Sequence, residues 1–115
     1  DAEAASRSAG HLADAEDALE WSVDQALASW PAPHSPFTIR DDGYPAEIFR
    51  RIIIRRLRHF QPELDIRAVT LDTLISGMRS RTRVMVGDLL IDPVPMEDAI
   101  WRISFAPRRN GHKNP

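Results

Sequence analysis

The stretch Pro45–Phe60 constrains the fold of this chain most strongly, because its apolar residues recur at helical spacing. Pro45 suits the first turn of a helix, where its missing N–H leaves no bond unmade, and Gln61-Pro62 predicts the end. At about 100° per residue, six apolar side chains share one face: Ile48, Phe49, Ile52, Ile53, Leu57 and Phe60. Their burial gains on the order of 10 kcal/mol before entropy, which predicts that this helix forms the centre of a small core.

The opposite side of this helix carries an arginine ridge, made of Arg51, Arg55 and Arg58 at positions i, i+4 and i+7. Arg50 lies beside the ridge. Like charges cannot pair with one another, so the ridge needs water or an anionic partner. Arg56 projects instead from the apolar face, and we expect its stem to be packed and its guanidinium to be held by a carboxylate.

Residues 1 to about 30 are predicted to form one long helix. Its apolar residues recur at helical spacing, and Asp14, Glu16, Asp17, Glu20 and Asp24 fill the other face. This acidic face has two interpretations that the sequence leaves open. It is either a solvated surface or an intramolecular cover for the basic helix. The proline-rich residues 31–36 then predict a linker.

The rest of the chain predicts a mostly helical region over 37–80 and a small sheet over 82–105. The short segment Phe37–Arg40 is β-prone, and Thr70 is expected to cap a shorter helix. Gly87-Asp88 lies between two β-prone runs and indicates a hairpin, and 99–105 alternates as a third strand. The predicted class is therefore α+β: a long N-terminal helix, a central basic helix, a shorter helix and an antiparallel sheet of about three strands. We expect a single domain over 1–106 and a basic, disordered tail over 107–115.

The net charge of −2 hides an uneven distribution of sign. Residues 1–32 hold seven acids and one base, whereas the remainder holds ten acids and 14 bases. Nearly all the bases are arginine, which favours recognition of phosphate or carboxylate, although a GC-rich genome has the same effect. Without a long apolar run or a signal peptide, a cytoplasmic location with no membrane contact is expected. The opening at Asp1 leaves open whether the chain is an excised piece of a longer protein.

The residue types that carry catalysis are present without the arrangement that catalysis needs. The five glycines are isolated, so no phosphate-binding loop is predicted, and the four histidines make no i, i+4 pair. Cysteine is absent, and Ser104 lacks a positioned base. We therefore expect no catalytic, metal-binding or cofactor-binding residues in this chain. The positive signal is electrostatic, because basic residues on separate elements can converge to track a phosphate backbone. The alternative is a solvated arginine surface, partly paired with the acidic first helix.

Five stretches in their order along the chain resemble a known family. They are residues 10–21, Tyr44-Pro-Ala-Glu-Ile-Phe-Arg-Arg-Ile-Ile-Ile-Arg-Arg-Leu57, Leu71-Asp-Thr-Leu-Ile-Ser-Gly77, Val84-Met-Val-Gly-Asp-Leu-Leu90 and Trp101-Arg-Ile-Ser-Phe-Ala-Pro-Arg-Arg109. Together they resemble the region that follows the catalytic domain in tRNA(Ile)-lysidine synthases, especially the short alphaproteobacterial type. The resemblance rests on element order and loose patterns, and it spans most of residues 10–109.

The resemblance implies an accessory domain that binds tRNA and has no catalytic residues of its own. The parent enzyme would use ATP, lysine and magnesium to modify the wobble cytidine, through a PP-loop domain whose Ser-Gly-Gly-X-Asp-Ser motif this chain lacks. The expected partners are tRNA and that catalytic domain, and a homodimer is left open. The predicted tRNA contacts are Arg50, Arg51, Arg55, Arg58, Arg81, Arg83, Arg108 and Arg109, of which Arg50, Arg51, Arg55, Arg108 and Arg109 gain support from the resemblance. The alternative function is a packing or dimerisation module without nucleic-acid contact, mediated by Leu12, Leu19, Val23 and Trp30.

Overall fold

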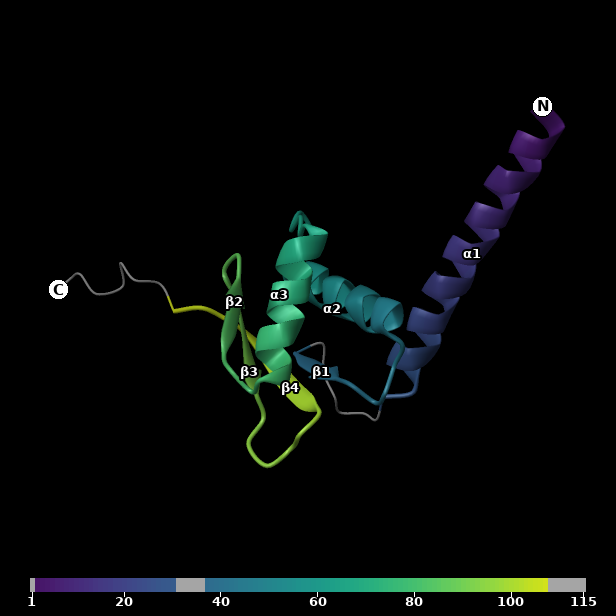
Figure 1. Cartoon of the computed structure of the whole chain (residues 1–115). Helices are drawn as coiled ribbons and strands as arrows, with labels where there is room; N and C mark the ends of the chain where they lie inside the picture. The colour runs from purple at the N-terminus through teal and green to yellow at the C-terminus, as the bar shows by residue number, and fades with distance from the viewer. Residues whose placement is uncertain (1, 31–36, 108–115) are drawn as a thin grey trace.

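The computed structural model describes residues 2–30 and 37–107, with side chains from Gly10 onward. Three helices and four strands follow one another in these ranges (Figure 1): α1 (Ala2–Ala28), β1 (Thr38–Arg40), α2 (Ala46–Phe60), α3 (Ala68–Arg79), β2 (Val84–Val86), β3 (Leu89–Pro93) and β4 (Ile100–Phe105). The strands form one antiparallel sheet in the order β1-β4-β3-β2. The predicted α+β class is confirmed. The predicted linker 31–36 and nearly all of the predicted tail, including Arg108 and Arg109, lie outside the described residues.

The sheet has a fourth strand that the sequence did not predict as part of it. β1 pairs with β4, so that Ile39 lies opposite Trp101, and Ile39 is fully buried. β1 is only three residues long, and a strand of that length has too few residues for its alternation to show which partner it pairs with. It joins the sheet by pairing with the side of β4 that β3 does not occupy.

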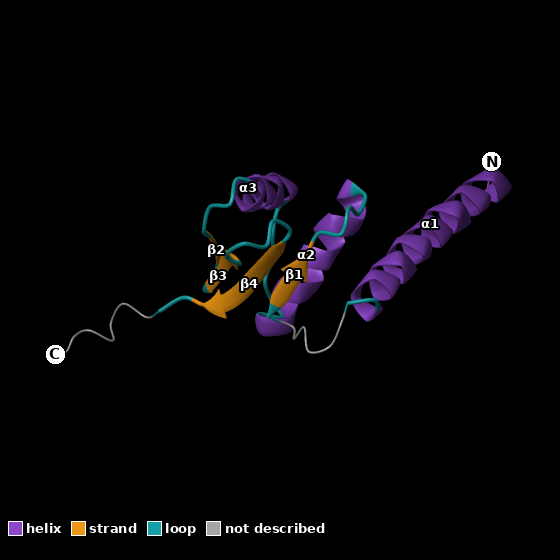
Figure 2. Cartoon of the chain, turned by 90° about the horizontal axis from the view of Figure 1, so that it is seen from below, coloured by secondary structure: helices purple, strands orange, loops and turns teal. Residues whose placement is uncertain are grey.

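The main core lies between one face of the sheet and two helices. Leu89 and Ile91 from β3 and Trp101 and Ile103 from β4 alternate toward this face. They form one buried cluster with residues of α2 and α3: Phe49, Ile53, Leu57, Leu71, Leu74 and Met78. Figure 2 shows α3 over the sheet and α2 beside β1. The opposite face of the sheet carries Arg40, Met85, Leu90, Asp92 and Arg102, and Figure 2 shows no described helix on it.

A second cluster joins α1 to the far side of α2. Val23, Ala26 and Trp30 from the end of α1 pack against Ile48 and Ile52 of α2. The N-terminal half of α1 extends away from the body (Figure 1). α2 therefore contributes buried residues to both clusters, and the prediction that it forms the centre of the core is confirmed.

Two local details follow from backbone hydrogen bonds and turn chemistry. α3 begins at Ala68 with Arg67 as its N-cap, so the prediction that Thr70 caps it is wrong. The N–H of Leu71 already bonds the carbonyl of Arg67 at 2.9 Å, which opens the first turn before Thr70. The hairpin at Gly87-Asp88 is confirmed, and the Gly-first order has a reason. Gly87 has φ +56°, which suits the first central position of a type II′ turn.

Candidate nucleic-acid interface

The arginine ridge of α2 faces α1 rather than solvent over two of its three positions. Nη1 of Arg51 donates to carboxylate oxygens of Glu16 and Glu20, both at 2.6 Å. Its Nε donates to Glu47, one turn earlier on α2, at 2.9 Å. The side chain of Arg51 is only 20% exposed. Three carboxylates therefore surround this one guanidinium.

Arg55 extends the same contact by one helical turn. It donates to Glu20 at 2.5 Å and also bonds Asp24. Glu16, Glu20 and Asp24 follow each other at four-residue spacing on α1, so they lie on one face, as do Arg51 and Arg55 on α2. Of the two interpretations left open for the acidic face, the structure supports the intramolecular cover for Glu16, Glu20 and Asp24, whereas Asp14 and Asp17 are exposed.

The charges of this contact shift the proton affinity of both partners. The hydrogen bonds that Arg51 donates to the Glu16 and Glu20 carboxylates raise the pKa of Arg51 above its ordinary value. The hydrogen bond from Arg51 lowers the pKa of Glu16. Both shifts favour the charged forms, so the pairing is an electrostatic one at neutral pH.

The two remaining basic residues predicted on α2 have separate partners. Arg50 Nε donates to Asp72 of α3 at 2.9 Å, and Arg58 Nε donates to the carbonyl of Leu64 at 3.1 Å. Arg58 is exposed. Within the described residues, the four predicted α2 contacts therefore do not form one continuous outward basic surface.

Arg56 does not have the carboxylate partner that we expected. Its guanidinium carbon lies 4.8 Å from the ring centroid of Trp30, a cation–π contact. Its Nε is buried, and no described residue accepts a hydrogen bond from it. Burial lowers the pKa of Arg56. The acids of α1 lie on the Arg51 side of α2, whereas Arg56 points toward the end of α1, where Trp30 is the neighbour.

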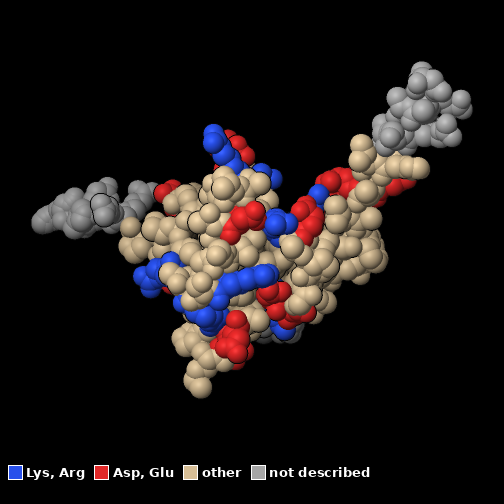
Figure 3. Space-filling view, viewed as in Figure 1, with Lys and Arg blue, Asp and Glu red and all other residues tan. Residues whose placement is uncertain are grey.

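The most exposed paired arginines lie where α3 ends and the hairpin begins. Arg79 bonds Asp41 at 3.2 Å and Arg83 bonds Asp92 at 2.5 Å, and their side chains are 54% and 67% exposed. Figure 3 shows Lys and Arg atoms gathered on the lower part of the body, among fewer acidic atoms. Each of these two arginines has one carboxylate partner, in contrast to the three around Arg51.

Arg81, which was predicted to contact tRNA, lies between them in the chain. Its backbone ends α3, and its side chain bonds the loop before β4. The N–H of Arg81 bonds Met78 and the N–H of Thr82 bonds Gly77, the pattern of a Schellman helix end. Arg81 occupies the left-handed position at φ +61°, where glycine is usual. Its guanidinium donates to the carbonyls of Val94 at 2.8 Å and Asp98 at 3.1 Å. It also lies over the ring of Trp101.

Arg102 is an exposed basic residue that the sequence prediction did not include. It lies on β4 directly opposite Asp92 of β3, and Asp92 in turn bonds Arg83. The strand alternation already placed Arg102 on the face opposite Trp101, which was the available signal. That Arg83 lies close to Arg102 could not be predicted without the strand order. Arg79, Arg83 and Arg102 are the residues that we call the exposed basic set.

Other kinds of site find no support in the described part of the chain. The residues from 10 to 30 and from 37 to 107 contain no group of three His, Asp or Glu side chains placed to hold a metal ion. None of the described helices is both long enough and apolar enough to cross a membrane. Comparison with protein families, with curated proteins and with solved structures gives no match. Any assignment to a family therefore rests on the resemblance of the five stretches.

Proposed function

We propose that this chain is a tRNA-holding accessory domain without catalytic residues, of the kind that follows the catalytic domain of tRNA(Ile)-lysidine synthases. One observation carries the proposal: Arg83 and Arg102 flank Asp92 on a sheet face that no described helix covers. A single exposed ion pair contributes only about 0–1 kcal/mol. A phosphate can therefore replace Asp92 as the partner of Arg83 at little cost.

The order of the five resembling stretches along the chain supports the proposal. The described residues of the five stretches fall on separate elements: α1, α2, α3, the β2–β3 hairpin and β4. In this proposal the tRNA contacts are the exposed basic set together with Arg108 and Arg109, which follow β4 in the chain. Arg51 and Arg55 serve instead to hold α1 on α2. The parent would be an ATP-dependent ligase, and this chain alone would turn nothing over.

A second candidate function is packing against another domain or protein without nucleic acid. α1 favours it, because Leu12 and Trp21 are 73% and 63% exposed on a helix that extends beyond α2. Their nine-residue spacing places them on opposite sides of the helix, so a partner would contact each of them separately. Val23 and Trp30, which were expected to mediate this packing, are buried against α2 of the same chain. The two functions make different predictions for tRNA binding.

The test measures binding of an unmodified isoleucine tRNA to the 115-residue chain over a series of salt concentrations. Two double variants remove the same charge: Arg79→Gln with Arg102→Gln, and Arg51→Gln with Arg55→Gln. We expect the first pair to flatten the slope of log K against log salt by roughly 0.7–0.9 for each lost phosphate contact. The second pair should leave that slope unchanged. Equal effects of both pairs would contradict the assignment, and absence of salt-dependent binding would favour the packing function.

A further inference from the structure

The hairpin strand β2 lies at an edge of the sheet. The strand order β1-β4-β3-β2 leaves its outer side without a described strand partner. A two-residue turn makes Val86 and Leu89 the first hydrogen-bonded pair, so the N–H and C=O of Met85 point outward. The side chain of Met85 is 61% exposed. An unpaired edge of this kind is a template for another strand.

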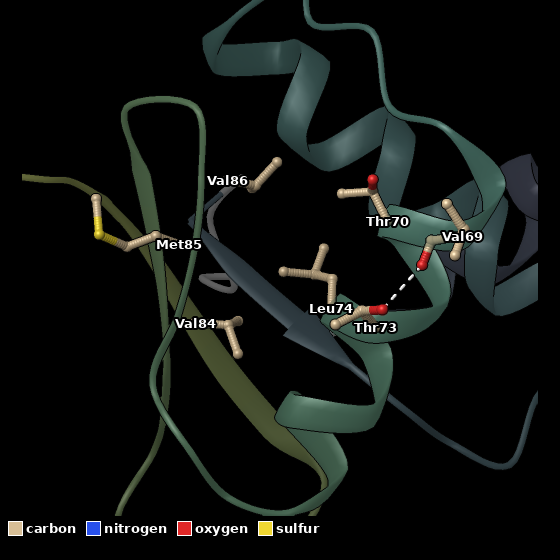
Figure 4. Close-up of a pocket in the computed structure, with 7 residues that line it drawn as sticks. All are labelled: Val69, Thr70, Thr73, Leu74, Val84, Met85 and Val86. Atoms are coloured by element: carbon tan, nitrogen blue, oxygen red, sulfur yellow. Dashed lines mark hydrogen bonds between the residues drawn. The ribbon is translucent and has the colours of Figure 1, made fainter.

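An apolar groove of about 350 Å³ runs beside this edge, between β2 and α3. Figure 4 shows Val84 and Val86 directed from β2 toward α3, with Leu74 between them and the helix, whereas Met85 points to the other side of the strand. Val69 at the rim is 70% exposed. An added strand would therefore find both backbone partners and a place for apolar side chains.

The charges that flank β2 identify a second copy of this chain as the occupant. Arg83 precedes the strand and Asp88 follows it, so the strand is positive at one end and negative at the other. Antiparallel pairing centred on Met85 would place Val84 opposite the partner's Val86. Arg83 would then lie opposite the partner's Gly87, one residue from its Asp88, and the same contact would occur twice. Within one copy Arg83 bonds Asp92 and Asp88 accepts a hydrogen bond from Gln61, so the attraction acts between the charged ends of the two strands. Parallel pairing would instead bring like charges together.

We propose that two copies of this chain associate through β2 to form one continuous sheet of eight strands, four from each copy. The partner's Val84 and Val86 fill the groove beside α3, and Met85 exchanges backbone hydrogen bonds with the partner's Met85. This inference does not depend on RNA binding. The RNA variants at Arg79 and Arg102 leave both flanks of β2 intact, so the two proposals fail separately.

The first test is the mass of the 115-residue chain by sedimentation over a concentration series. We expect a dimer that Val69→Glu weakens by roughly tenfold or more, because the new carboxylate would be buried at the groove rim. Met96→Lys is the control, since Met96 is 98% exposed on a different loop and should have no effect. Amide exchange at Met85 should slow with concentration in the wild-type chain and not in Val69→Glu. A folded wild-type chain that stays monomeric throughout would overturn the proposal, as would a dimer that ignores Val69→Glu.

The second test determines the strand direction. Arg83→Asp gives β2 two negative flanks and Asp88→Arg gives it two positive ones, so each variant alone should associate several-fold more weakly. An equal mixture of the two should form heterodimers in preference to either homodimer. The Arg83→Asp chain lacks the Arg83–Asp92 pair as a monomer, in a homodimer and in a heterodimer alike. The loss of that pair therefore cannot by itself favour the heterodimer. A random distribution of the three dimers would overturn the proposed pairing.

Discussion

A Cβ atom added to Gly77 would lie 2.5 Å from Cγ1 of Val84. α3 thus approaches β2 so closely that an alanine at this point of the helix would overlap the Val84 side chain unless one of them moved. This close approach leads to a prediction whose sign is unusual.

Gly77→Ala should destabilise the protein by about 1 kcal/mol. Alanine in place of glycine within a helix normally gains roughly 0.5–1 kcal/mol, but overpacking costs about 1–3 kcal/mol. Urea unfolding measures the difference. Gly10→Ala, with no atom within 4 Å of its Cβ, is the control and should be neutral or stabilising. In a Val84→Ala background Gly77→Ala should become favourable, and a stabilising Gly77→Ala in the wild-type chain would contradict the contact.

Arg81→Gly should be less destabilising than Arg81→Ala, by about 1 kcal/mol. Both variants lose the guanidinium bonds to Val94 and Asp98. Only glycine relieves the left-handed backbone, which costs an alanine about 1–2 kcal/mol. The comparison uses the free energy of unfolding of the two variants side by side. Equal stabilities would mean that the Arg81 backbone stores no strain.

The α1–α2 contact should weaken in acid. Arg51 lowers the pKa of Glu16 in the folded state, so the contribution of this pair is present above the unfolded pKa of glutamate, about 4.3. It is lost as the pH falls through the lower, folded value. Carboxyl titration by NMR should show the depressed pKa in the wild-type chain and a return toward the usual value in Arg51→Gln. Arg50→Gln removes the same charge from α2 without touching Glu16, and it should leave that titration in place.

Tyr44→Phe should destabilise the protein by about 1–3 kcal/mol. Nε1 of Trp30 donates to the Tyr44 hydroxyl at 2.7 Å, and that hydroxyl donates to Asp42 at 3.1 Å. Removing the hydroxyl leaves the Trp30 N–H without this acceptor between α1 and the body. Thermal unfolding with tryptophan fluorescence gives the measurement. Asp42→Asn keeps an acceptor for the hydroxyl and should cost less, so a larger loss in Asp42→Asn would argue against the Trp30 bond as the main contribution.

Local periodicity was enough to predict the helices and the hairpin. The apolar spacing from Ile48 to Leu57 placed α2 in the core, and the turn residues Gly87-Asp88 placed the hairpin. It was not enough for β1, because three residues show no period and their partner β4 lies about 60 residues further along the chain. The start of α3 depended on a backbone bond at Arg67 that no capping side chain announced.

The candidate site was less predictable, because its geometry depends on long-range neighbours. Arg51 and Glu16 are 35 residues apart, and a helical period says nothing about which other helix a ridge will face. Matching four-residue spacings on the two helices were the available clue. The prediction of a carboxylate partner for Arg56 was wrong for the same reason, because the packing of α1 brings the ring of Trp30 next to its guanidinium.

The cover of the arginine ridge has a practical consequence for anyone who shortens this chain. The first 32 residues carry seven acids and one base, so a shortened protein without them changes from a net charge of −2 to +4. It would also uncover Arg51 and Arg55. Such a protein would adhere to nucleic acids of any sequence through simple counterion release. In a deletion-mapping experiment, the shortened protein would then show nucleic-acid binding that the full chain does not have at Arg51 and Arg55.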